Sequence, residues 1–118
     1  MTDPAPHELS AEDQKLVTLA RATRGRTGGP EGAAVRDSDG RTYAAATVRL
    51  PSLQVSALGV CVAMAVSSGS RGLEAAVLLS DTEQVSPLDL DVLRDFGGAG
   101  VTVHVGDPGG TVSSSTTT

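Results

Sequence analysis

An apolar run in the middle of the chain, Ala57 to Val66, limits the folds that this sequence can adopt. The run covers about half of the roughly 20 residues that a membrane-spanning helix needs, so it predicts a buried helix. Ser52 or Ser56 can cap the start of this helix, and Ser68-Gly69 ends it. Because apolar side chains lie nearly all round it, the helix belongs against the face of a sheet or at a contact between subunits.

The chain has 118 residues, which suits a single domain with one core. We expect a flexible N-terminal arm over residues 1–9, one domain over residues 10–112 and a disordered tail over residues 113–118. The N-terminus lacks the charge and the apolar segment of a secretory signal. Neither export nor a membrane location is therefore expected.

Charge and composition exclude some classes of partner. The formal net charge is -5 at pH 7, and Tyr43 and Phe96 are the two aromatic residues, so nucleic-acid binding is not expected. The single cysteine, Cys61, excludes an intrachain disulfide and favours a reducing cytoplasm. Its expected role is that of a small core residue.

The remaining pattern predicts alternating helices and strands. Local signals include a capping box at the first helix and a strong hairpin turn at Asp37-Ser38-Asp39-Gly40. The expected order predicts a mixed sheet with helices on both faces, an α/β fold. The elements are a helix from Ser10 to Thr27, strands over 32–36 and 41–48, the helix after Ser56, a buried strand over 73–79, a helix from Ser86 to Phe96, a strand over 101–105 and a possible short last strand.

The first hairpin carries a family resemblance. Gly32-Ala33-Ala34-Val35, followed by Asp39-Gly40-Arg41 and Tyr43, resembles the corresponding hairpin of the small cytidine deaminases. The likeness runs from Pro30 through Ser52 into Val62-Ala63-Met64, and it resumes from Glu74 to Thr82, at Val92-Leu93 and at Asp95-Phe96. The resemblance implies the three-layer cytidine deaminase-like fold.

The resemblance also implies a zinc site at the starts of two helices. In that family three thiolates, or a histidine and two thiolates, hold the zinc, and a glutamate moves protons between the bound water and the base. In the gap-free register the first ligand and the glutamate fall on Leu58-Gly59-Val60, and the second ligand motif falls on Pro87-Leu88-Asp89-Leu90-Asp91. The sugar-binding Asn-x-Glu motif falls on Thr47-Val48-Arg49, which reverses the charge of the acceptor.

We therefore predict no catalytic residues, no metal ligands and no cofactor. The positions that would form a vestigial pocket are Thr47, Arg49, Leu58, Val60, Pro87, Leu88 and Asp91. A rebuilt metal site from Cys61, His104 and Asp89 is conceivable, yet these residues lack ligand spacing. Ser-His-Asp catalysis is equally unsupported, since no serine stands in a Gly-x-Ser-x-Gly motif.

Two functions remain open. The first is a catalytically inactive, zinc-less protein with a binding, assembly or regulatory role. It would be a homo-oligomer through helix 56–68, as the resemblance implies, and could keep a pocket for a small nucleoside-like ligand. The alternative is a divergent cytidine or nucleoside deaminase that uses zinc to hydrolyse the exocyclic amine of a pyrimidine.

Overall fold

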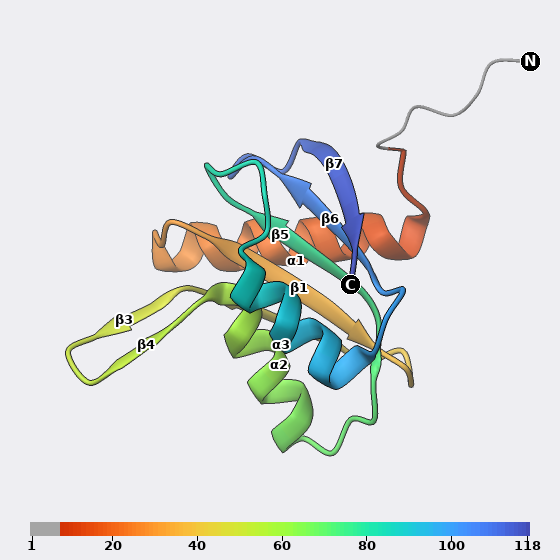
Figure 1. Cartoon of the computed structure of the whole chain (residues 1–118). Coiled ribbons are helices and arrows are strands. Elements are labelled where there is room, and N and C mark those ends of the chain that lie inside the picture. The colour runs from red at the N-terminus through yellow and green to blue at the C-terminus, as the bar shows by residue number, and fades with distance from the viewer. Residues whose placement is uncertain (1–7) are drawn as a thin grey trace, which may run out of the picture.

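A five-stranded mixed sheet forms the centre of the computed structural model, which describes residues 8–118 (Figure 1). Its strand order is β2-β1-β5-β6-β7. Strands β5 and β6 run parallel, and the other neighbouring pairs run antiparallel. The predicted α/β architecture is confirmed. The strands are β1 (Gly32–Asp37), β2 (Thr42–Ala46), β5 (Leu73–Leu79), β6 (Thr102–Gly106) and β7 (Val112–Thr117).

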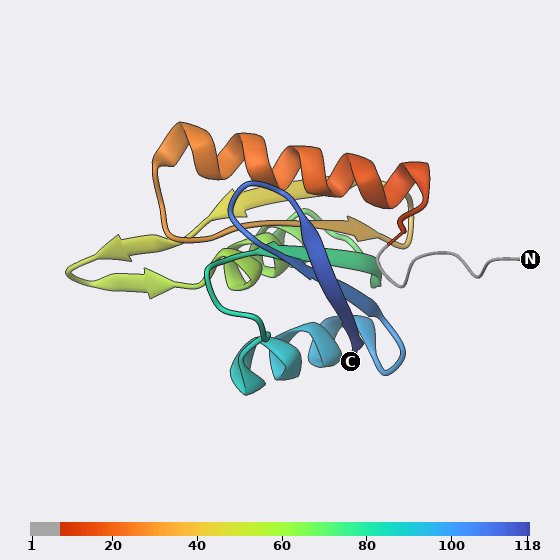
Figure 2. The same ribbon diagram turned by 90° about the horizontal axis from the view of Figure 1, so that it is seen from above.

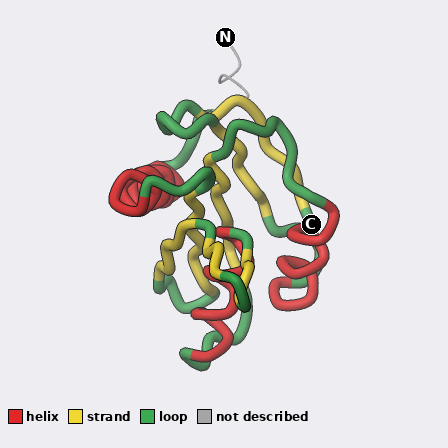
Figure 3. Tube along the Cα trace, turned by 90° about the vertical axis from the view of Figure 1, so that its left-hand side faces the viewer, coloured by secondary structure: helices red, strands yellow, loops and turns green. Residues whose placement is uncertain are grey.

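Three helices cover the two faces of this sheet. Helix α1 (Ala11–Thr27) lies on one face, and α2 (Ala57–Ser67) and α3 (Pro87–Gly97) lie on the other (Figures 2 and 3). Strand β5 sends alternate side chains into both layers: Val77 packs with α1, and Leu78 packs with the α2 and α3 side. Burial on both faces explains why this strand is apolar at every position except the exposed Glu74.

The helix starts are the ones that the capping signals predict. Ser10, Ser56 and Ser86 each have extended backbone angles and accept a hydrogen bond from the backbone N–H three residues later. Helix α1 ends at Gly28, whose φ of 68° lies in the left-handed region that glycine adopts at low cost. Within residues 8–118, no helix is long and apolar enough to cross a membrane.

The segment between the sheet and α2 differs from its prediction. The sequence predicts a strand that continues to Val48, whereas β2 ends at Ala46 and a second hairpin follows, made of β3 (Val48–Leu50) and β4 (Leu53–Val55). This hairpin extends away from the main sheet (Figure 1). Pro51 follows β3 at the second position of the tight turn that joins it to β4, where the fixed φ of proline fits.

The C-terminal residues also differ from their prediction. The sequence predicts a disordered tail over residues 113–118, whereas Val112–Thr117 forms edge strand β7, paired with β6. A run of serine and threonine has the composition of a disordered segment. Its backbone nevertheless pairs with β6 along the strand, with one register shift between Val105 and Gly106, and composition does not reveal that partner. At the other end, residues 1–7 of the predicted arm lie outside the described residues.

Candidate functional site at the starts of two helices

The starts of α2 and α3 meet through a direct side-chain contact. Ser56, the N-cap of α2, donates its hydroxyl to Asp89 Oδ1 of α3 at 2.6 Å. The same Ser56 Oγ accepts the backbone N–H of Gly59 at 3.0 Å. Asp89 is 6% exposed, so the contact is almost closed to solvent. The two helix starts are therefore joined by one short hydrogen bond to a carboxylate.

Local sequence puts Asp89 in position for this contact. Ser86 caps α3 by accepting the Asp89 backbone N–H at 3.1 Å, and Pro87 occupies the first turn. An acidic side chain in the first turn is favoured by the partial positive charge of the helix start. Because the starts of α2 and α3 lie together, the Asp89 carboxylate serves both helices.

A small cavity of about 250 Å³ adjoins this contact. Thr47 and Arg49, two of the predicted pocket positions, line it together with Ser56. The Thr47 hydroxyl donates to Glu31 Oε1 at 3.3 Å, and both Glu31 and Arg49 line the cavity. The other lining residues are Val48, Gln54 and Val55.

The other predicted positions lie elsewhere. Leu58 is fully buried in the core between α2 and the sheet, and Val60 is half-buried against the same core. Leu88 is 71% exposed, and Pro87 is exposed beside it. Asp91 is exposed and pairs with Arg94 at 3.1 Å. Thr47 and Arg49 thus reach the cavity beside the helix starts, while Leu88 and Asp91 face solvent.

The gap-free register did not select Ser56 or Asp89 as site residues. Ser56 lies two residues before Leu58, and Asp89 lies between the two positions assigned to thiolates. Both residues were recognisable as helix-start residues from the capping pattern. Since the metal ligands implied by the resemblance also sit at helix starts, that pattern locates the site better than a gap-free register does.

The residues at the helix starts do not fit a zinc ion. Residues 56–60 and 86–91 contain neither cysteine nor histidine, and Asp89 supplies the single carboxylate that faces α2. Two oxygen ligands of one tetrahedral zinc lie roughly 3.4 Å apart, because each is about 2.0–2.2 Å from the metal. The 2.6 Å between Ser56 Oγ and Asp89 Oδ1 is instead a hydrogen-bond distance.

The rebuilt metal site considered from the sequence is not assembled in the fold. Cys61 packs in the core on the α2 side of the sheet, where burial raises the pKa of its thiol to about 12. His104 instead contacts Asp13 of α1, on the opposite face. Across residues 8–118, no three His, Cys, Asp or Glu side chains gather in a group that could hold a metal ion.

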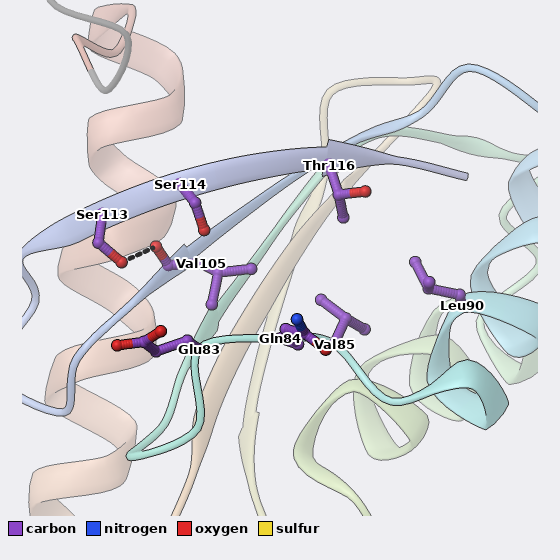
Figure 4. Close-up of a pocket in the computed structure, with 8 residues that line it drawn as sticks. All are labelled: Glu83, Gln84, Val85, Leu90, Val105, Ser113, Ser114 and Thr116. Carbon is purple, nitrogen blue, oxygen red and sulfur yellow. Dashed lines mark hydrogen bonds between the residues drawn. The ribbon is translucent and has the colours of Figure 1, made fainter.

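A larger cavity, of about 670 Å³, lies between α3 and the β7 edge of the sheet (Figure 4). Val85, Leu90 and Val105 give it an apolar side, and Ser114 and Thr116 of β7 face it with hydroxyl groups. None of the predicted pocket positions lines this cavity. We therefore place the candidate site at the helix starts, where two predicted pocket positions lie beside the contact between Ser56 and the buried Asp89.

The three-layer arrangement and the paired helix starts define a class of protein, and comparison with known proteins agrees. A family model described as cytidine deaminase-like matches residues 9–110. The chain therefore belongs to the cytidine deaminase-like family, and the resemblance predicted from the first hairpin is confirmed. No individually curated protein matches the chain.

Solved structures with the same fold are cytidine deaminases from bacteria. The enzyme from Burkholderia pseudomallei is similar with a TM-score of 0.77 and 20% identity over 92% of each chain. The enzyme from Mycobacterium leprae is similar with a TM-score of 0.72 and 20% identity over 92% of this chain and 94% of that chain. The enzyme from Mycobacterium tuberculosis is similar with a TM-score of 0.68 and 21% identity over 80% of this chain and 85% of that chain. At these identities the likeness shows the fold alone.

Proposed function

We propose that this chain is a catalytically inactive, zinc-less member of its family with a binding, assembly or regulatory role. The observation that carries the proposal is the hydrogen bond between Ser56 and Asp89 at the helix starts. A deaminase of this family needs a metal-bound water and a glutamate there. Here Ser56 and Asp89 form a hydrogen bond with each other. Leu58, at the predicted ligand position, is buried in the core.

The experiment that tests this proposal is the metal content of the purified protein, combined with a deaminase assay. We expect zinc far below one ion per chain and no change in the ultraviolet absorbance of cytidine. A zinc-dependent cytidine deaminase, assayed in parallel, is the positive control. Zinc at one per chain, or deamination that a chelator abolishes, would overturn the proposal.

The alternative is a divergent cytidine or nucleoside deaminase. It is favoured by the family match and by the solved structures named above, which are described as cytidine deaminases. Zinc content and activity distinguish the two functions, because both require the same fold. The assay should therefore include cytosine and other aminopyrimidines beside cytidine.

A retained binding function would use the cavity beside the helix starts. Glu31 and Arg49 give it one carboxylate and one guanidinium, which suit a small polar ligand such as a nucleoside. A thermal-shift screen of nucleosides and nucleotides tests this role. We expect a stabilising ligand whose effect is lost in Arg49→Ala, and a flat response across the panel would contradict it.

Assembly would use the outer side of α2. Val66 is 52% exposed, Ala63 is exposed, and Val60 and Met64 are only half-buried, so the helix presents an apolar strip without a charged residue. We propose that a second copy of the chain covers this strip. Light scattering after gel filtration should show an oligomer that Val66→Glu dissociates. Leu19→Glu, at an exposed leucine of α1 on the other face, is the matched control.

A further inference from the structure

A second group of reactive side chains lies on the opposite face of the sheet, under the start of α1. His104 of β6 contacts Asp13 of α1 through Nε2, with 2.9 Å to Asp13 Oδ2. Its other ring nitrogen, Nδ1, is 2.7 Å from the hydroxyl of Ser115 on β7. His104 is 8% exposed. Ser115, His104 and Asp13 thus form a hydrogen-bonded row of serine, histidine and aspartate, in which Asp13 comes from a distant part of the sequence.

The chemistry of the three groups fixes the position of the proton on the histidine. An ionised carboxylate only accepts hydrogen bonds, so Asp13 requires the proton to sit on His104 Nε2. In the neutral ring, Nδ1 then carries a lone pair and accepts the hydroxyl proton of Ser115. This arrangement, with a nucleophile bonded to a base and the base bonded to an orienting carboxylate, is the one that activates serine for attack.

Neighbouring charges keep Asp13 ionised. Arg36 donates to Asp13 Oδ1 at 2.9 Å, and Glu74 accepts from Arg36 Nε at 2.7 Å. Burial acts to raise the pKa of Asp13, but the hydrogen bonds from His104 and Arg36 and the charge of Arg36 outweigh it and hold that pKa below its usual value. The Asp13 carboxylate is therefore a fixed anion at the inner end of the hydrogen-bonded row.

The outer end of the hydrogen-bonded row, at Ser115, is open to a substrate. Ser115 is exposed on edge strand β7, and it lies directly across from His104 in the pairing with β6. Thr118 donates its backbone N–H inward, to the Val101 carbonyl. Because inward and outward groups alternate along an antiparallel strand, the N–H of Ser115 points away from the sheet. A backbone donor thus accompanies the exposed hydroxyl.

We propose that Ser115 is an activated nucleophile that accepts an acyl group from an ester, with His104 as general base and Asp13 as the residue that positions it. The inference is independent of the function proposed above, because this site lies on the other face of the sheet. Its substrate class is an ester that binds at an open sheet edge, since Ser115 is exposed there and lines none of the cavities described above.

The step balances with the groups present. Ser115 Oγ forms a bond to the ester carbonyl carbon as its proton moves to His104 Nδ1, and the carbonyl π electrons move to the oxygen, near the outward N–H. Collapse of this intermediate breaks the bond to the alkoxy group, which leaves with the proton from His104. Water then attacks the acyl-serine by the same route, which releases the acid and restores the hydroxyl.

Covalent labelling with a fluorophosphonate probe tests the proposal. Ser115 Oγ would form a bond to phosphorus, fluoride would leave, and the hydroxyl proton would pass to His104. We expect one label per chain, located on Ser115 by peptide mass spectrometry, and hydrolysis of p-nitrophenyl acetate at the same site. Asp13→Asn should slow labelling by about a hundredfold or more, because it removes the anion that orients the base.

Ser114→Ala is the matched control, because Ser114 neighbours Ser115 on the same strand but faces the cavity of Figure 4. Labelling should persist in Ser114→Ala and disappear in Ser115→Ala and in urea-unfolded wild type. Circular dichroism establishes that each variant is folded. Absence of label from the folded wild type, equal labelling of Ser114, or a rate unchanged in folded Asp13→Asn would overturn the proposal, and would leave only a structural tie between α1 and the sheet.

Discussion

Replacing Ser56 with alanine removes two hydrogen bonds at the point where α2 meets α3. One is the cap to the Gly59 N–H at 3.0 Å, and the other is the 2.6 Å bond to the Asp89 carboxylate. A helix cap contributes about 1 kcal/mol, and a hydrogen bond to a charged group about 1.5–3 kcal/mol. We therefore expect Ser56→Ala to lower the free energy of unfolding by about 3 kcal/mol.

A double-mutant cycle separates the bond between the helices from the two caps. Urea unfolding of Ser56→Ala, Asp89→Ala and the double variant, at one fixed protein concentration, should give a coupling energy of about 1.5–3 kcal/mol. Ser86→Ala is the control, because Ser86 caps α3 through the Asp89 N–H and makes no bond to α2. It should cost only about 1 kcal/mol. A coupling below about 0.5 kcal/mol would refute the reasoning that this bond joins the helix starts.

Three further predictions concern other parts of the chain. Leu58→Ala should lower the free energy of unfolding by about 2–5 kcal/mol, while Leu88→Ala should change it by no more than about 0.5 kcal/mol, because Leu58 is fully buried and Leu88 is 71% exposed. Equal losses in urea unfolding would contradict the placement of these positions. Cys61, which is buried and has a thiol pKa raised to about 12, should resist Ellman's reagent in the folded protein and react fully in urea. The hydrogen bond from Ser70 lowers the pKa of buried Asp37 despite its burial, with help from the Arg41 and Asp39 N–H groups, so its stabilisation is present at neutral pH and lost as the pH falls below about 4. The pH dependence of urea unfolding should be shallower in Asp37→Asn, and an unchanged slope would count against this assignment.

Much of the fold could be predicted because its signals are local. Ser10, Ser56 and Ser86 mark helix starts through bonds to residues three positions away, and the turn after Asp37 closes the first hairpin. The run over 73–79, apolar except for Glu74, identifies a central strand, since burial on both faces leaves no regular polar alternation. These features depend on interactions between residues that are close in the sequence, so the sequence alone is enough to predict them.

The candidate sites were less predictable, because they depend on residues that meet only after folding. Ser56 and Asp89 are 33 residues apart, so their contact cannot be read from either segment alone. The gap-free register therefore placed the site at Leu58 and Val60 and not at the cap residue Ser56. The hairpin formed by β3 and β4 was missed because each strand has only three residues, too few for a clear pattern. Strand β7 was missed because its stability comes from pairing with β6.

The sequence by itself determined the helices, the central strands and the family, since caps, turn residues and apolar periodicity act between near neighbours. Only the tertiary structure decided which functional groups meet. Ser56 reaches Asp89 because α2 and α3 pack on the same face of the sheet. Asp13 reaches His104, 91 positions away, because α1 packs on the opposite face of the sheet. A hydrogen bond needs its two atoms within about 3 Å, and for distant residues that separation is set by the packing of the sheet and its helices.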